Sequence, residues 1–288
     1  MEGWSLPNSI FILIISILYV LSAIIAAFGN TFSLIVLLQP SQRSKSNKVL
    51  TSLGASDCLI GYVCYPAALW FFNHIDHEVS ALFKKVAFLV GTWIICCSIF
   101  SIVFITYDRY TRITKPFQYH EIITNRRINI ILISIWVGHL ITSFLCTLNN
   151  TFYIIFINLV IVSTTAALVA GYYYIWKAVK QSQTDITSLR GIDREKARTD
   201  IRLAKKVLMI VVVYFLAFLP LSIFAIASLV LKDWVQPYVA YMYIIGAFFC
   251  FSNSCINPFI YIWKDLKFRR ACKRILENKG VCNLHSQQ

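Results

Sequence analysis

One acidic residue, Asp57, lies deep inside an apolar stretch of the sequence, in the segment LTSLGASDCLIG. Ionisable groups in such stretches are costly to bury and usually functional. Polar residues at matching depth in other apolar stretches are Asn30, Ser98, Asn253, Ser254 and Asn257. A carboxylate among such oxygen atoms suits a hard monovalent cation or a few ordered water molecules. A hydrogen-bonded network that only holds helices together accounts for the same residues.

A charged pair, Asp108 and Arg109, ends another apolar stretch, and Asp200 opens a later one in ARTDIRLAKKV. The planar fork of an arginine can bridge two carboxylates at once. We therefore expect Arg109 to link two helices at their inner ends through these two acids, so that breaking the link opens a cleft. A charge cluster at the helix ends, in the headgroup region of a membrane, is the alternative.

Seven apolar stretches must position these residues. The chain has 288 residues, of which 58% are hydrophobic and 14% charged, whereas a soluble domain carries about a quarter charged residues. Each stretch is long enough to cross a bilayer as a helix, which needs about 20 residues. The sequence thus predicts an all-α fold, a seven-transmembrane helix bundle with spans near 9–38, 47–73, 81–113, 126–148, 152–180, 200–231 and 236–263. A soluble all-α protein is disfavoured because its helices would need polar faces.

Basic residues set the expected orientation. Of the 27 Lys and Arg residues, all but Lys84, Lys85 and Lys232 fall on one side of the predicted bundle. Because basic loops stay in the cytoplasm, we expect a multi-pass plasma-membrane protein. Residues 1–8 form a short extracellular N-terminus, 9–263 the seven-transmembrane domain, and 264–288 a cytoplasmic eighth helix and tail. The first helix is expected to act as an uncleaved anchor. The net charge of +14 then reflects topology and attraction to membrane lipids, with no nucleic-acid partner expected.

Seven motifs occur in order along these stretches. They are GN at 29–30, the Asp57 segment, DRYTRITKPF at 108–117, Trp136, Pro220, NPFIY at 257–261 and KDLKFRR at 264–270. In this combination the chain resembles the rhodopsin-like (class A) G-protein-coupled receptors over nearly its whole length. Lys84 replaces the family's usual cysteine, Thr164 replaces its proline in the fifth helix, and the loop after the fourth helix is nearly absent. These departures resemble the subgroup of melanocortin, lysophospholipid, cannabinoid and adenosine receptors.

The resemblance implies a receptor, not an enzyme, that signals to a heterotrimeric G protein when its sixth helix moves outward. The implied sodium site consists of Asp57, Ser98, Asn253 and Asn257. The implied switch consists of Asp108, Arg109, Tyr110, Tyr172, Asp200, Phe218, Pro220, Asn257, Pro258 and Tyr261. The implied G-protein contacts are Ile113, Pro116 and Phe117. Phe218 and Tyr214 replace the family's toggle tryptophan and the phenylalanine below it, so high constitutive activity is one implied outcome. The segment after Lys264 resembles the short amphipathic eighth helix.

The implied ligand pocket has an apolar and aromatic lining. It includes Phe88, Gly91, Thr92, Ile95, Phe156, Phe218, Leu221, Tyr243 and Ala247. Lys84 and Lys85 stand at its mouth, so a lipid or other amphiphile with an anionic head suits it. The same lining can also reflect helix packing alone. The alternatives are a peptide, as in melanocortin receptors, or an orphan receptor that is active without a ligand. The peptide would meet His74, Asp76, His77 and Glu78.

Two ligand types are not expected. Gly91 stands where amine receptors carry an aspartate, and Phe251 where opsins carry the lysine that binds retinal. A seven-helix transporter or pump is the alternative of another class, disfavoured because only Asp57 and His139 are ionisable groups deep in the stretches. We also expect poor glycosylation of Asn149, because its loop is short, and lipid attachment at Cys272 or Cys282.

Overall fold

The computed structural model describes residues 9–42, 44–73, 80–186, 209, 212–220, 222–224, 226–227, 239–264 and 268–275. In chain order the elements are α1 (Ser9–Leu37), the 3-10 helix η1 (Pro40–Gln42), α2 (Lys45–Leu59), the π-helix η2 (Ile60–Cys64), α3 (Tyr65–Asn73), α4 (Ala81–Thr114), α5 (Tyr119–Ile122), α6 (Asn125–Cys146), α7 (Asn150–Ile186) and α10 (Val239–Lys264). Residues 212–220 and 268–275 are also helical, and the described residues contain no strand.

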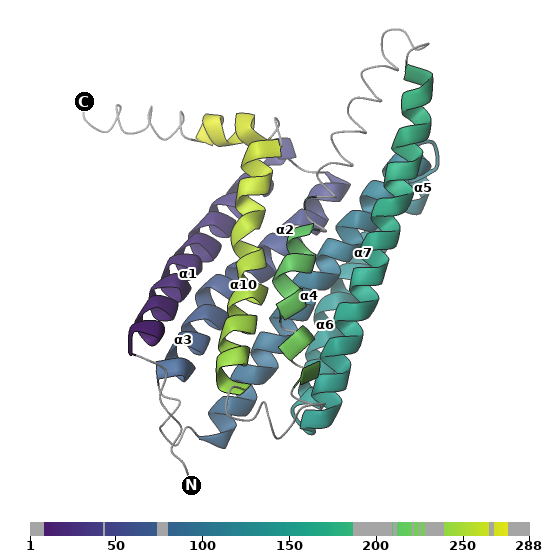
Figure 1. Ribbon diagram of the computed structural model, residues 1–288. Coiled ribbons are helices and arrows are strands. Elements are labelled where there is room, and N and C mark those ends of the chain that lie inside the picture. The colour runs from purple at the N-terminus through teal and green to yellow at the C-terminus, as the bar shows by residue number, and fades with distance from the viewer. Residues whose placement is uncertain are drawn as a thin grey trace, which may run out of the picture.

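The helices form a bundle around α4, which packs against α2, α6 and α7, while α1 packs against α2 and α10. Figure 1 shows that α5, the start of α2 and the helix 268–275 lie at one end of the bundle, which we call the α5 end. The start of α4 and the link between α6 and α7 lie at the opposite end. The expected all-α bundle is confirmed. Six of the seven expected spans coincide with described helices, and the sixth span, 200–231, is described only in part.

Polar side chains fix where several helices begin. The hydroxyl oxygens of Ser44, Ser80 and Thr124 accept hydrogen bonds of 3.1, 3.2 and 3.2 Å from backbone N–H groups three residues on, at the starts of α2, α4 and α6. Such caps satisfy amides that have no partner inside the helix. Asn149 does the same for α7, because its Oδ1 accepts from Phe152 N over 3.1 Å. The only residues between α6 and α7 are 147–149, so the Asn149 side chain lies against a helix end.

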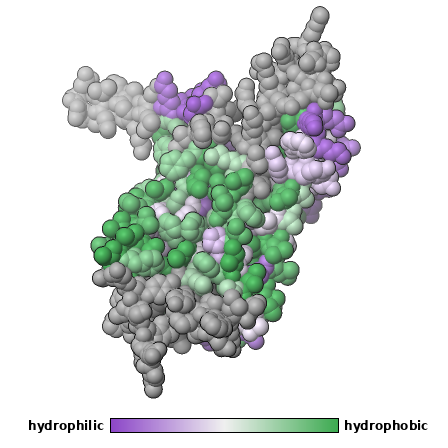
Figure 2. Space-filling model, viewed as in Figure 1, coloured by the Kyte–Doolittle hydropathy of each residue, from purple (hydrophilic) through white to green (hydrophobic). Residues whose placement is uncertain are grey.

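The outside of the bundle is apolar. Four described helices are long and apolar enough to cross a membrane, namely Ile10–Leu37, Leu82–Thr114, Asn125–Cys146 and Thr151–Gln181. On α1 alone, Ile10, Leu13 and Phe28 are 62%, 60% and 63% exposed. Proteins in water rarely expose such a continuous apolar surface. Figure 2 shows the same division, with hydrophobic residues around the middle and hydrophilic ones gathered at the α5 end.

The helix 268–275 closes the α5 end beside α1. Phe268 and Ala271 are buried with Val36 and Leu37 in a small apolar cluster, against which Cys272 packs. An amphipathic eighth helix was expected here, and the packing agrees with one. Burial raises the pKa of the Cys272 thiol, so less of the reactive thiolate forms at neutral pH. The second candidate for lipid attachment, Cys282, lies outside the described residues.

A close backbone contact joins α1 to η2. A Cβ atom built on Gly61 would lie 2.3 Å from the backbone nitrogen of Ala27 and 2.7 Å from its Cα. Backbone atoms cannot move aside as the end of a flexible side chain can. Only a glycine at this position therefore lets the two elements approach so closely.

We predict that Gly61→Ala lowers the stability of the purified protein by about 1–3 kcal/mol, the usual cost of overpacking. Gly138→Ala is the matched control, since a Cβ at that helical position has nothing within 4 Å. The control should be neutral or slightly stabilising, because alanine favours a helix over glycine by about 1 kcal/mol. Melting temperatures in one detergent measure both. A Gly61→Ala variant with the melting temperature of the wild type would contradict the close contact between α1 and η2.

Candidate functional site

Asp57 accepts three hydrogen bonds inside the bundle. The Oγ atoms of Ser98 in α4 and Ser254 in α10 donate to its Oδ1 over 3.1 and 2.7 Å. The Nδ2 of Asn257 donates to its Oδ2 over 2.6 Å. Asp57 is 0% exposed. The structure thus brings two of the expected partners, Ser98 and Asn257, onto the carboxylate, and it adds Ser254 as a third.

The other two asparagines at this depth, Asn253 and Asn30, do not bond directly to Asp57 among the described residues. Asn253 is buried, but no hydrogen bond joins it to Asp57 among the described residues. Asn30 is 0% exposed and donates through Nδ2 to the backbone carbonyls of Ala26 and Ser254. Its Oδ1 is a buried acceptor without a hydrogen-bond donor in the described part of the chain. The site therefore holds an unused acceptor close to the residue that contacts the acid.

Among the described residues, no Lys or Arg forms an ion pair with Asp57. The ion pair found among the described residues joins Arg109 to Asp108, and Asp57 takes no part in it. An isolated buried carboxylate is costly, so the group must either hold a proton or be neutralised by a cation. The serine hydroxyls can rotate to offer lone pairs instead of protons. An oxygen-rich donor set of this kind fits a hard monovalent cation.

A second buried acid, Asp108, is held by hydroxyl groups at the α5 end. Ser46 in α2 donates from Oγ to Asp108 Oδ2 over 2.7 Å, and the hydroxyl of Tyr119 in α5 donates to Oδ1 over 2.7 Å. Asp108 is 2% exposed and Tyr119 5%. Burial raises the pKa of Tyr119, and the negative charge of Asp108 acts in the same direction, so the phenol stays protonated as a donor. These bonds tie α5 to both α2 and α4.

Arg109 lies beside this acid but contacts it more loosely. Its Nε is 3.9 Å from Asp108 Oδ2, and 15% of its side chain is exposed. Asp200, the other acid expected to restrain Arg109, lies outside the described residues. The structure therefore places one of the two expected acids next to the arginine.

Two residues that differ from the family pattern, Tyr214 and Thr164, contact each other. The hydroxyl of Tyr214 lies 2.6 Å from Thr164 Oγ1 in α7, and Thr164 in turn donates to the carbonyl of Val160 over 2.6 Å. Tyr214 also stacks on Phe218, with ring centroids 4.6 Å apart. The helical segment 212–220 is thereby linked to α7 by a polar bond just before Pro220. A phenylalanine and a proline, the usual residues, could not make this bond.

The other expected switch residues are spread along the bundle. Pro258 lies inside α10, and a Cβ on Gly29 would come within 3.0 Å of its Cγ. Tyr110 and Tyr172 are partly buried against the main core. The side chain of Tyr261 lies outside the described residues. No contact of the described atoms joins these residues directly, so their shared role stays a prediction.

The expected G-protein contacts lie at and just after the end of α4, at the α5 end. Ile113 packs against the core, whereas Phe117 is 94% exposed. Pro116 lies between them and is partly buried. A large aromatic side chain so fully exposed next to Tyr119 offers an apolar contact to another molecule.

The expected ligand-pocket residues lie toward the opposite end. The Phe88 ring is 4.1 Å from that of Tyr153, and a Cβ on Gly91 would have nothing within 4 Å. Of the remaining described lining residues, Thr92 and Phe218 are buried, and Ile95, Phe156 and Ala247 are partly buried. Leu221 and the side chain of Tyr243 lie outside the described residues. The described residues of this set line neither the cavity bordered by α1, α2 and α6 nor the one between α7 and residues 212–216.

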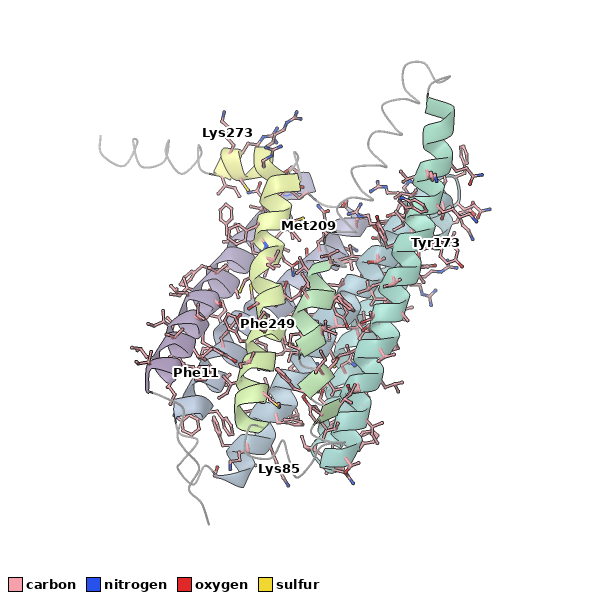
Figure 3. All side chains as sticks on the ribbon, in the orientation of Figure 1. Phe11, Lys85, Tyr173, Met209, Phe249 and Lys273 are labelled. Atoms are coloured by element: carbon pink, nitrogen blue, oxygen red, sulfur yellow. The ribbon has the colours of Figure 1, made fainter. Side chains whose placement is uncertain are left out.

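Lys84 and Lys85 are exposed near the start of α4. Figure 3 shows Lys85 at the end opposite Lys273. The start of a helix carries partial positive charge, so lysines there do not stabilise the helix. They add to a local positive potential instead.

Two contact residues, Ser46 and Tyr119, escaped the sequence analysis. Ser254 was noted there for its depth but is not in the implied sodium site; it lies three residues before Asn257 and therefore on the same helix face. Ser46 and Tyr119 lie 62 and 11 residues from Asp108, and no periodic pattern connects either to it.

We predict that Tyr119→Phe loosens α5. The change removes one hydrogen bond to a charged group, worth about 1.5–3 kcal/mol, and keeps the ring over which Arg112 stacks at 5.3 Å. Amide hydrogen exchange of residues 118–123 should quicken by about ten-fold or more. Tyr174→Phe, at a 53% exposed ring, is the control and should change nothing. Unchanged exchange in the Tyr119 variant would mean that its hydroxyl does not anchor α5.

The chain is similar in sequence to known membrane receptors over most of its length. The chain matches the model of the 7 transmembrane receptor (rhodopsin family) over residues 29–152 and 146–261. It is 23% identical to compound eye opsin BCRH2 of Hemigrapsus sanguineus over 90% of this chain and 77% of that one. Adenosine receptor A2b of Bos taurus is 24% identical, over 84% and 83%. A rhodopsin of Mizuhopecten yessoensis described as GQ-coupled is 24% identical, over 94% and 59%. The matched residues include Asp57, Arg109 and Asn257, and the chain belongs to the rhodopsin family of seven-transmembrane receptors, which are G-protein-coupled receptors and not enzymes.

Proposed function

We propose that this receptor works at the plasma membrane with its α5 end in the cytoplasm, where it engages a heterotrimeric G protein. The charge distribution supports this orientation, since basic residues gather at the α5 end, whereas Lys84 and Lys85 lie near the start of α4 at the other end. Phe117, 94% exposed at the α5 end, provides an apolar contact for the G protein.

The observation that carries the proposal is the fixed position of Asp108 beside Arg109. Asp108 is held by two 2.7 Å hydrogen bonds, and Arg109 Nε lies 3.9 Å from its Oδ2. Asp108 thus provides a fixed acidic partner for the arginine. In the proposed switch Arg109 leaves the acids when the sixth helix swings outward, and Asp200 is its second restraint. The bond between Tyr214 and Thr164 opposes that swing.

Two substitutions test this switch. Arg109→Ala should abolish G-protein coupling at equal surface expression. Asp200→Ala should raise ligand-free coupling, because a partly exposed ion pair is worth about 0.5–2 kcal/mol, a shift of about 2- to 30-fold. Lys115→Ala, an exposed cation that caps the end of α4, is the control. A G-protein dissociation assay measures all three. Normal coupling by the Arg109 variant, or reduced ligand-free coupling by the Asp200 variant, contradicts the switch.

We further propose that Asp57 binds a sodium ion. The unpaired buried charge, the serine hydroxyls and the unused Oδ1 of Asn30 support it. Ser98, Asn257 and Ser254 would surround the ion, and Asn253 lies next to them in sequence. The ion would neutralise the acid and draw α2, α4 and α10 together.

Sodium titration of thermal stability tests this site. Wild-type receptor should melt higher in sodium than in an equal concentration of N-methylglucamine, and Asp57→Asn should lose the difference. Ser33→Ala is the control. It removes a fully buried hydroxyl that donates to the Gly29 carbonyl within α1, and it should keep the difference in melting temperature between the two salts. A sodium response that persists in the Asp57 variant would rule out this assignment.

For the ligand we propose an amphiphile with an anionic head. The aromatic residues near Phe88 suit an acyl chain, and Lys84 and Lys85 suit the head. A retinal chromophore is not carried over from the opsins, because α10 has no lysine before Lys264.

Lysophosphatidic acid and an uncharged monoacylglycerol are the probes for this ligand class. Lysophosphatidic acid should activate the receptor at a lower concentration, and replacing Lys84 and Lys85 by Gln should weaken it by about ten-fold or more, from about 1 kcal/mol per basic residue. Lys232→Gln, the other basic residue on that side, is the control. Activation by peptides alone, or full activity without any ligand, would support one of the alternatives instead.

A further inference from the structure

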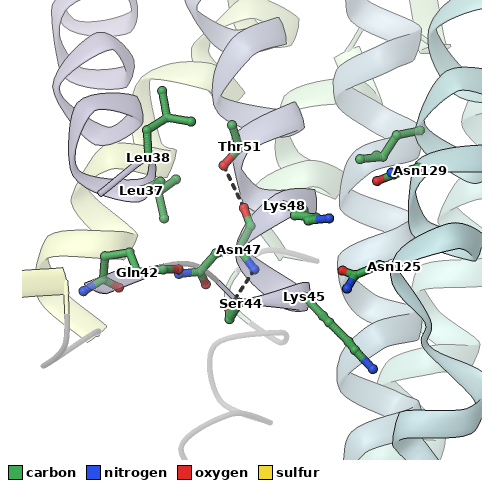
Figure 4. A pocket seen from close by; sticks show the side chains of 11 residues that line it. Leu37, Leu38, Gln42, Ser44, Lys45, Asn47, Lys48, Thr51, Asn125 and Asn129 are labelled. Atoms are coloured by element: carbon green, nitrogen blue, oxygen red, sulfur yellow. Dashed lines mark hydrogen bonds between the residues drawn. The ribbon is translucent and has the colours of Figure 1, made fainter. Parts of the chain in front are cut away.

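A large cavity opens at the α5 end, away from the predicted ligand pocket. It has a volume of about 780 Å³ and is lined by residues of α1, α2 and α6, so we call it the α1–α2–α6 groove. Figure 4 shows its lining side chains. None of the 11 residues that line it is acidic, and two of them, Lys45 and Lys48, are basic. The switch, the sodium site and the ligand pocket make no use of this groove.

The lining changes character with depth. On α2 it runs from Lys45 through Lys48 to Thr51, and on α6 from Asn125 through Asn129 to Leu132. These residues recur every three or four positions, so each set occupies one face of its helix. At about 1.5 Å per residue, Thr51 and Leu132 lie about 10 Å further into the bundle than the first residues. The groove is therefore cationic and amide-rich at its mouth and more apolar inside.

The mouth is arranged for an anion. Figure 4 shows Lys48 directed across the cavity toward α6, where Asn125 and Asn129 lie. Lys45 Nζ lies 3.4 Å from both Nδ1 and the carbonyl oxygen of His120, and no ion pair joins it to a carboxylate among the described residues. The helices α2 and α6 both begin at this mouth, and helix starts carry partial positive charge. Two lysines and two helix starts thus give one positive region, and amide groups beside it can donate hydrogen bonds.

The sides of the groove point to a lipid and not to a free ion. Leu37 and Leu38 line it from α1, and Leu38 is 62% exposed. On α6, Ile133 follows the lining residue Leu132 in sequence and is 62% exposed on the apolar outer surface. A small inorganic anion needs neither this apolar lining nor a cavity of this size. A phospholipid needs both, because its acyl chains must leave the site along an apolar surface.

We propose that the α1–α2–α6 groove binds an anionic phospholipid of the cytoplasmic leaflet. The phosphate lies between Lys45 and Lys48, the polar head contacts Asn125 and Asn129, and an acyl chain follows Leu38 into the membrane. The leaflet rests on the proposed orientation of the receptor. Because the start of α2 also carries Ser46, which donates to Asp108, an occupied groove braces the part of α2 that anchors the switch.

Native mass spectrometry of the purified receptor, titrated with phosphatidylserine or phosphatidylcholine, tests the site. Phosphatidylserine should bind more tightly. Lys48→Gln should weaken it about five-fold and the double change with Lys45→Gln about thirty-fold, as expected from about 1 kcal/mol per basic residue. Lys115→Gln removes the same charge outside the groove and should have little effect. Equal losses in Lys48→Gln and Lys115→Gln would reduce the effect to general charge attraction and overturn the proposal.

A second variant separates shape from charge. Asn129 is exposed and lines the groove, so Asn129→Phe fills space without changing charge. This variant should lose phosphatidylserine, while its melting temperature shows that it folds. Full binding by this variant, or displacement of the lipid by an equal concentration of inorganic phosphate, would overturn the proposal in favour of a surface or soluble-anion site. The measurement needs no G protein or agonist, so it stands or fails independently of the signalling tests.

Discussion

The bundle depends on the hydrogen bonds that converge on one buried carboxylate. In lipid, apolar side chains gain little by leaving the solvent, so apolar contact alone does not select one arrangement of helices. Polar groups do, because each must find a partner within the protein. Asp57 receives donors from α4 and α10, and its own helix, α2, packs against both α1 and α4. A rotation of any of these helices would leave a buried charge with fewer partners.

The same rule explains the other links between helices. Trp136 in α6 donates from Nε1 to Ser52 Oγ in α2 over 3.0 Å, and Trp93 in α4 donates to the Trp136 carbonyl over 2.8 Å. Tyr19 in α1 donates to the Ile244 carbonyl in α10 over 2.8 Å. The bond between Tyr214 and Thr164 is of the same kind. Polar pairs at several depths therefore align the described helices, and apolar residues fill the space between them.

Much of this was predictable from the sequence. Long apolar stretches predict spans directly, and the family, the receptor function and the all-α fold are confirmed. Ser98 and Asn257 were predictable as neighbours of Asp57 because spans of known direction place them at one depth. Tyr119 was not, because a short loop helix has no period that fixes which way it folds back, and Ser46 was not, because nothing in the sequence relates the start of α2 to Asp108 at the end of α4. The π-helix η2 also escaped, since its residues are as apolar as those of an α-helix.

The short link between α6 and α7 has a consequence for how the protein is made. Residues 147–149 are all that joins a helix of 22 residues to one of 37, and Asn149 is already part of the second helix's cap. So few residues cannot wait outside the bilayer while the next helix is synthesised. We therefore expect the two helices to enter the membrane together as one hairpin, with the basic start of α6, at Arg126 and Arg127, favouring one direction of insertion.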